Sequence, residues 1–142
     1  MLSKNDVVGV WKLLTCKQIN LDTGKEQDVY GQDPNGYLCY TPEGRMFAIL
    51  TRGGEGAPAP SPESWARSDG GLNAYGGTFS ITPDGLIHHV GIAMDAKRVG
   101  SDQVRYARLE DGILKIESAV MAFADAPRTK RILTWQKIES FA

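Results

Sequence analysis

The chain has two histidines, and they stand side by side at His88 and His89 inside the apolar run "LIHHVGIAM" of residues 86–94. If this run is a strand, neighbouring side chains point to opposite faces, so one histidine faces the interior. The bulkier and more apolar face carries Leu86, His88, Val90, Ile92 and Met94. This pattern predicts that His88 points inward and His89 outward.

An imidazole exchanges a proton near neutral pH, so an inward His88 could act as a general acid or base. It could equally be a core histidine that a single hydrogen bond holds neutral. A catalytic role needs a partner that stabilises negative charge on a substrate oxygen, and the run 102–110 offers Arg105 and Tyr106. Their alternation leaves open which of the two faces inward.

An inward Arg105 would be a fixed cation able to bind a carboxylate or an enolate. Its alternative is a surface position where its aliphatic stem covers apolar area. With His88 near a neutral pKa as the base and Arg105 or Tyr106 at the enolate oxygen, the three residues could transfer a proton next to a carbonyl group.

Three aromatic residues are further candidates for ligand contact. Tyr40 and Tyr75 flank turn and glycine signals, where a hydroxyl could reach a ligand or simply pack. Trp65 lies in the Gly-, Pro- and Ser-rich segment 53–71, within a predicted short helix over 61–68 that Ser61 would cap. This segment is either a disordered insertion or a lid with Trp65 as its anchor.

Metal and cofactor signals are absent from the sequence. We find no phosphate-binding loop, no dinucleotide fingerprint and no H-E-x-x-H, and adjacent histidines on opposite faces cannot ligate one metal ion. The two cysteines, Cys16 and Cys39, lie in strand-like stretches without ligand spacing. We expect no cofactor, no metal, and two buried free thiols.

Turn signals divide the chain into short apolar segments. Examples are "DPNG" at Asp33, "TPEG" at Thr41 and "TPDG" at Thr82, where Gly and Pro set the backbone angles of a turn. The predicted strands cover 8–20, 27–30, 36–41, 45–52, 76–82, 86–94, 102–110, 112–121 and 130–138. We therefore predict an all-β, eight- to nine-stranded antiparallel barrel that forms one domain over 1–142, with one long loop or short helix.

Composition excludes several classes of partner. The 16 Lys and Arg residues are balanced by 17 Asp and Glu, which gives a net charge of −1. The basic residues do not cluster into a patch along the sequence. Neither nucleic acid nor a membrane surface is an expected partner. Because the N-terminus lacks an apolar leader, we expect a cytoplasmic protein. A homodimer is compatible with the sequence.

Six ordered blocks resemble the lipocalin-like domain family of small bacterial and fungal proteins. They are "GVWKL" from Gly9, "YGQDPNGYLCYTPEGRM" from Tyr30, "AYGGTFSI" from Ala74, "IHHV" from Ile87, "RVGSDQVR" from Arg98, and "LTW" ending at Trp135. The resemblance implies a calycin-type barrel in which Trp11 packs at the closed end. A late basic residue, Arg131 or Lys137, would cover its indole. It also points to His88 and Arg105 as ligand positions.

Two functions follow from these residues. The first is binding of a small hydrophobic or aromatic molecule in the barrel cavity. The alternative is a cofactor-independent isomerase, cyclase or lyase in natural-product biosynthesis, with His88 as general acid or base on a polyketide- or terpenoid-like substrate. A barrel filled by its own side chains would instead be a scaffold, because fold alone does not fix function.

Overall fold

The computed structural model describes residues 1–142 apart from 58, 60, 66–70, 123 and 142. Among the described residues the order of elements is α1 (Lys4–Val7), β1 (Gly9–Asn20), β2 (Glu26–Asp28), β3 (Asn35–Tyr40), β4 (Arg45–Thr51), α2 (Pro62–Trp65), β5 (Asn73–Thr82), β6 (Gly85–Ala93), η1 (Ala96–Arg98), β7 (Asp102–Glu110), β8 (Ile113–Ser118) and β9 (Thr129–Glu139). No helix in this part of the chain is both long and apolar enough to cross a membrane.

The strands form a closed antiparallel barrel. Neighbours follow the order β1-β3-β4-β5-β6-β7-β8-β9, and β9 pairs back onto β1 from Val10↔Glu139 to Asn20↔Thr129. One more described strand, β2, lies outside this ring of eight and pairs with residues 17–19 of β1. Closure leaves no long unpaired strand edge in the ring. The all-β barrel expected from the turn spacing is confirmed.

Most predicted strands lie within a few residues of those observed. The largest differences are in β5, which begins at Asn73 rather than 76, and in β8, which ends at Ser118 rather than 121. The predicted helix over 61–68 appears as α2, with Ser61 Oγ accepting the Ser64 N–H at 3.1 Å, while 66–68 lie outside the described residues. The sequence analysis missed α1, whose Ser3 and Asp6 form a reciprocal capping box.

A β-bulge in the β5–β6 pair changes which side chains face inward. Gly77 pairs with Val90, but Gly76 pairs with Ile92, so Gly91 is the extra residue. Leu86, His88 and Val90 are buried as predicted, whereas Ile92 and Met94 are 69% and 50% exposed. The inward facing predicted for Ile92 and Met94 is wrong because alternation shifts by one residue at the bulge.

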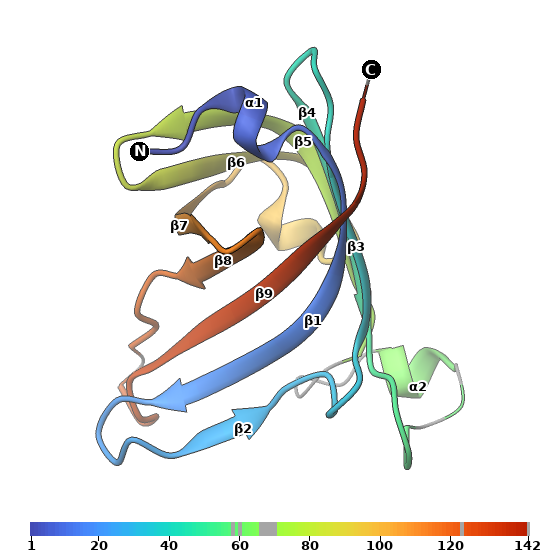
Figure 1. The fold of residues 1–142 in the computed structure, drawn as a ribbon. Coiled ribbons are helices and arrows are strands. Elements are labelled where there is room, and N and C mark those ends of the chain that lie inside the picture. Colours follow the sequence, from blue (N-terminus) through green and yellow to red (C-terminus); the bar gives the residue numbers. More distant parts are fainter. Residues whose placement is uncertain (58, 60, 66–70, 123, 142) are drawn as a thin grey trace.

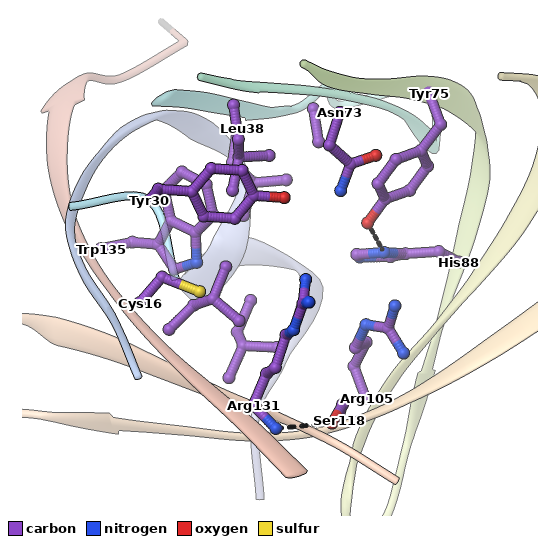
Figure 2. A pocket seen from close by; sticks show the side chains of 14 residues that line it. Cys16, Tyr30, Leu38, Asn73, Tyr75, His88, Arg105, Ser118, Arg131 and Trp135 are labelled. Carbon is purple, nitrogen blue, oxygen red and sulfur yellow. Dashed lines mark hydrogen bonds between the residues drawn. The ribbon is translucent and has the colours of Figure 1, made fainter. Parts of the chain in front are cut away.

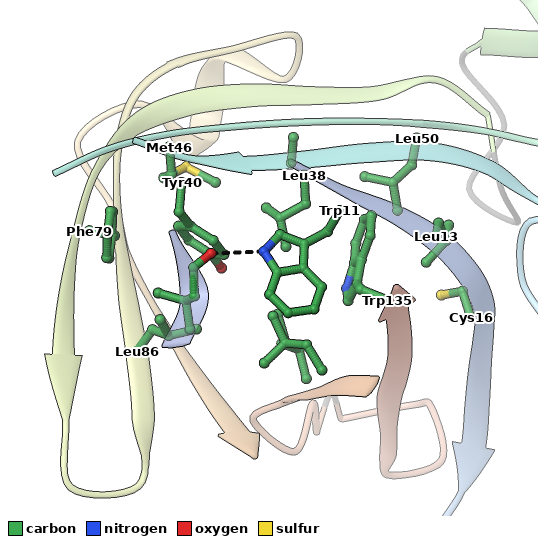
Figure 3. Packing of buried hydrophobic residues seen from close by; sticks show 14 of the residues in the cluster. Trp11, Leu13, Cys16, Leu38, Tyr40, Met46, Leu50, Phe79, Leu86 and Trp135 are labelled. Atoms are coloured by element: carbon green, nitrogen blue, oxygen red, sulfur yellow. Dashed lines mark hydrogen bonds between the residues drawn. The ribbon is translucent and has the colours of Figure 1, made fainter. Parts of the chain in front are cut away.

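One end of the barrel is filled by packed side chains around Trp11 (Figure 3). The Trp11 indole donates from Nε1 to the Val7 carbonyl of α1 at 2.8 Å, and Lys137 Nζ lies 5.0 Å from the centroid of its ring. Of the two basic residues that the resemblance offered, Lys137 covers the indole. The N-terminal helix α1 lies at this end and β2 and α2 at the other (Figure 1).

Candidate ligand-binding cavity

The barrel interior holds a cavity of about 90 Å³. It is lined by the apolar side chains of Leu38, Ala48, Leu50, Ile116, Leu133 and Trp135 and by the side chains of Cys16, Tyr30, Asn73, Tyr75, His88, Arg105, Ser118 and Arg131 (Figure 2). Sites for drug-sized ligands usually measure about 300–1,000 Å³. The cavity therefore suits a small molecule with one apolar side and one polar side.

His88 is the inward histidine of β6, and only 2% of its surface is exposed. Its Nε2 lies 2.7 Å from the Tyr40 hydroxyl of β3. Its Nδ1 lies 2.9 Å from the Tyr75 hydroxyl of β5, a contact that Figure 2 shows. His89 faces outward, where its ring contacts Ser80 and Asp102. The facing that alternation predicted for both histidines is observed.

The two tyrosines fix the direction of hydrogen bonding through His88. The Tyr40 hydroxyl is fully buried, and among the described residues its polar partner is His88. A buried O–H without an acceptor is costly, so Tyr40 donates to Nε2. The proton of the neutral ring then resides on Nδ1, which donates to Tyr75. This arrangement leaves the Tyr75 O–H free to donate toward the cavity that it lines.

His88 is a weak base in this environment. Burial, as the main cause, and the nearby charges of Arg105 and Arg98 together lower its pKa from 6.5 to about 3. The near-neutral pKa expected from the sequence is wrong, because desolvation disfavours the charged imidazolium. Both ring nitrogens are also occupied by tyrosine hydroxyls.

Arg105, and not Tyr106, faces the interior from β7. Arg105 is partly buried and lines the cavity, while Tyr106 is 44% exposed on the outer face of the barrel. The option that Tyr106 stabilises a reacting oxygen beside His88 is wrong, because consecutive residues of a strand point to opposite faces. Arg105 pairs across the sheet with Ser118 of β8.

Two further arginines, which the sequence analysis did not assign to a ligand site, lie beside Arg105. The Gln103 Oε1 atom accepts from Arg105 Nη2 at 2.7 Å and from Arg98 Nη2 at 2.8 Å. Arg98 also stacks 4.2 Å from the centroid of the Tyr75 ring. Arg131 of β9 lines the cavity and donates from Nε to Gln18 Oε1 at 3.1 Å. The distribution of charge along the sequence could not predict this cluster, because Arg98 comes from η1 and the other two arginines come from separate strands.

The remaining predicted contacts have different outcomes. Tyr75 lines the cavity, whereas Tyr40 lies behind His88 with 0% exposure and reaches a ligand only through that ring. This corrects the prediction of direct contact for Tyr40. The side chain of Trp65 lies outside what the structure describes, so its role as a lid anchor stays a prediction.

Burial also lowers the reactivity of the Cys16 thiol beside the cavity. Desolvation raises the pKa of the Cys16 thiol to about 11, and both Cys16 and Cys39 are free, although Cys39 is only partly buried. The indole Nε1 of Trp135 is buried and has no hydrogen-bond partner among the described residues. Within the same residues no group of three His, Cys, Asp or Glu side chains could hold a metal ion.

Comparison with known proteins assigns the family. The sequence matches the family model of the lipocalin-like domain over residues 8–138, a range that contains all the barrel strands except the last residue of β9. The chain belongs to the lipocalin-like domain family. No curated protein matches it.

In this lipocalin-like domain the packed core borders directly on the cavity, because Leu38, Leu50 and Trp135 belong to both. Trp11 and Lys137 stabilise the closed end, while His88, Tyr75, Arg105 and Arg131 lie around the cavity. A polar cluster beside an apolar wall can orient a small molecule inside the barrel.

Proposed function

We propose that this protein binds a small hydrophobic or aromatic molecule inside its barrel. The observation that carries the proposal is a cavity inside the barrel whose lining combines the apolar Leu38, Leu50 and Leu133 with the polar His88, Tyr75 and Arg105. A ligand would bury its apolar part against the leucines, and the polar group would fix its orientation.

The catalytic alternative, an isomerase, cyclase or lyase of natural-product biosynthesis, has less support. General base catalysis is most effective when the pKa of the base is near the working pH. Burial lowers the pKa of His88 to about 3, and both ring nitrogens are hydrogen-bonded to tyrosines. These features favour a histidine that orients a ligand over one that removes a proton from it.

The experiment is a ligand screen by NMR on protein with labelled methyl groups. Small aromatic and aliphatic molecules should shift the methyl signals of Leu50, Ile116 and Leu133, which line the cavity. Wild-type protein should leave the bound molecule chemically unchanged after prolonged incubation. Conversion of a molecule to a product would support the catalytic alternative instead.

A filled cavity provides the control. Leu133→Trp adds bulk at a lining position and should abolish the shifts, whereas Ile132→Trp changes the neighbouring residue of β9, which does not line the cavity. Both variants must first give the folded spectrum. Equal binding by the two variants would overturn the assignment of the ligand to this cavity.

Two further expectations stay predictions. A homodimer would appear as a doubled mass in sedimentation velocity experiments. A cytoplasmic location would be tested by fractionating the cells that produce the protein.

A further inference from the structure

We propose that the ligand of this cavity is an organic acid whose carboxylate is held between Arg105 and Arg131. This inference rests on the proposed binding function and adds the chemical class of the ligand. Its basis is that the cavity lining among the described residues carries arginines but no carboxylate to balance their charge.

The arginines around the cavity all donate to neutral oxygens. Arg98 and Arg105 share the amide oxygen of Gln103, Arg98 also donates to Asn73 Oδ1 at 2.6 Å, and Arg131 donates to Gln18. The described lining of the cavity contains no Asp or Glu. Within the described part of the chain, these three guanidinium groups therefore have no carboxylate partner at this end of the barrel.

Arginines elsewhere on the same molecule do find carboxylates. Arg108, which is on β7 like Arg105, contacts Glu110 at 2.6 Å, and Arg128, just before β9, contacts Asp22 at 3.0 Å. These pairs lie on the surface, where water already screens charge and a partner matters little. Among the described residues no carboxylate pairs with the partly buried Arg98, Arg105 or Arg131, for which a missing counter-charge costs more.

The register brings two of the cavity arginines within reach of one ligand. Arg105 pairs with Ser118 of β8, and the Arg131 N–H donates to the Ser118 hydroxyl at 2.9 Å. The two arginines thus flank a single strand, and strands lie about 4.8 Å apart, so their backbones are separated by about 10 Å. Figure 2 shows both guanidinium groups extending into the cavity from β7 and β9.

The rest of the lining fits an acid with an apolar frame. A guanidinium offers planar paired donors that match the two oxygens of a carboxylate. The Tyr75 O–H, whose oxygen accepts from the neutral His88 ring, supplies another donor. The lining also includes the apolar side chains of Leu38, Leu50 and Leu133, and the cavity volume of about 90 Å³ favours a single ring or a short chain over a long lipid.

The test compares acids with their uncharged amides. Isothermal titration calorimetry at low salt would be run on the full chain with benzoate, phenylacetate and hexanoate, each beside its primary amide. Each pair shares one frame and differs in charge. We expect at least one acid to bind tenfold or more tightly than its amide, with methyl shifts at Leu133 and Ile116 that place it in the cavity.

Matched variants assign the charge effect to the two arginines. Arg105→Gln and Arg131→Gln should each weaken binding of the acid by about ten- to a hundredfold, the typical size of a hydrogen bond to a charged group. They should leave the affinity of the amide within about threefold. Arg108→Gln and Arg128→Gln remove the same charge from the surface and should leave both affinities unchanged.

The outcomes separate this inference from the proposed function. If amides bind in the cavity as tightly as acids, the molecule is a binder of neutral ligands and the inference is overturned. If no acid or amide binds, while the screen finds other cavity ligands, the inference is again overturned and the function stands. If the surface variants weaken acid binding as much as the cavity variants do, the carboxylate is not held between Arg105 and Arg131.

Discussion

At the scale of single residues, His88 connects three strands through one neutral ring. Tyr40 of β3 and Tyr75 of β5 occupy its two nitrogens, and the ring itself belongs to β6. Buried polar atoms are tolerated when their hydrogen bonds are complete. The same contacts that make His88 acceptable in the interior also make it a poor proton acceptor.

The first prediction concerns stability against pH. The folded-state pKa of His88 is about 3, below its ordinary 6.5, so between these values the unfolded chain binds the extra proton. Stability from this group is therefore present above about pH 6.5 and is lost as the pH falls toward 3, at up to about 1.4 kcal/mol per pH unit. Urea unfolding measured across this range should show the slope.

Two glutamine variants isolate the contribution of His88. His88→Gln should flatten the pH dependence relative to wild type, while His89→Gln removes the outward histidine and should leave the slope unchanged. If NMR showed that the His88 ring of folded wild-type protein titrates near pH 6, the buried neutral state would be wrong.

The second prediction compares the two tyrosines. Tyr40→Phe removes the hydroxyl that contacts His88 Nε2 in a fully buried position. Because no water can replace it there, the free energy of unfolding should fall by about 1–3 kcal/mol. Tyr75→Phe should cost less, because water in the cavity can replace its hydroxyl. Denaturant unfolding of both variants tests this order, and equal losses would contradict it.

At the scale of elements, the bulge between β5 and β6 decides which residues reach the cavity. Up to Val90 the strand keeps the alternation that places His88 inside, and beyond Gly91 the facing shifts so that Ile92 lies outside. The close approach of the two strands requires a residue without a side chain at Gly77. A β-carbon there would lie 1.9 Å from the His89 carbonyl oxygen.

The third prediction uses the two glycines of this bulge. Gly77→Ala should lower the free energy of unfolding by about 1–3 kcal/mol, because the clash is with backbone that cannot move freely. Gly91→Ala has no neighbour closer than 3.9 Å and no positive φ, so it should be neutral or gain about 0.4–1 kcal/mol. Thermal unfolding of the pair provides the measurement, and a larger loss at Gly91 would show that the bulge is placed incorrectly.

At the scale of the whole molecule, closure of the barrel gathers positive charge that the chain as a whole does not show. The formal net charge is −1, yet Arg98, Arg105 and Arg131 approach one end of the interior with neutral partners. Like charges in a partly dry space repel one another, so the empty barrel gives up stability that a bound anion would restore.

The fourth prediction follows from this repulsion. Arg131→Met should raise the free energy of unfolding of the ligand-free protein by about 1 kcal/mol, because it replaces an unpaired, partly buried charge with an apolar side chain. Lys130→Met removes a charge that is paired with Glu117 at 3.7 Å. It should lower the free energy of unfolding by less than about 1 kcal/mol. Denaturant titrations without ligand test both variants, and a loss in Arg131→Met equal to that in Lys130→Met would contradict the repulsion.

The sequence by itself determined the properties that depend on near neighbours. Turn residues such as Gly and Pro mark where strands end, so the approximate positions of the strands and the all-β barrel could be predicted. Alternation placed His88 inside and His89 outside, because the facing of side chains repeats every two residues along a regular strand.

The tertiary structure alone decided the properties that depend on pairing between distant segments. The alternation along the sequence left open whether Arg105 or Tyr106 faces inward. The register of β7 against β6 and β8 places Arg105 inside. The bulge at Gly91 depends on how β5 pairs with β6, and the arginine cluster depends on closure of the ring. Local pattern sets which faces a strand has, but register and closure are cooperative properties of pairs of strands, and they decide which side chains meet.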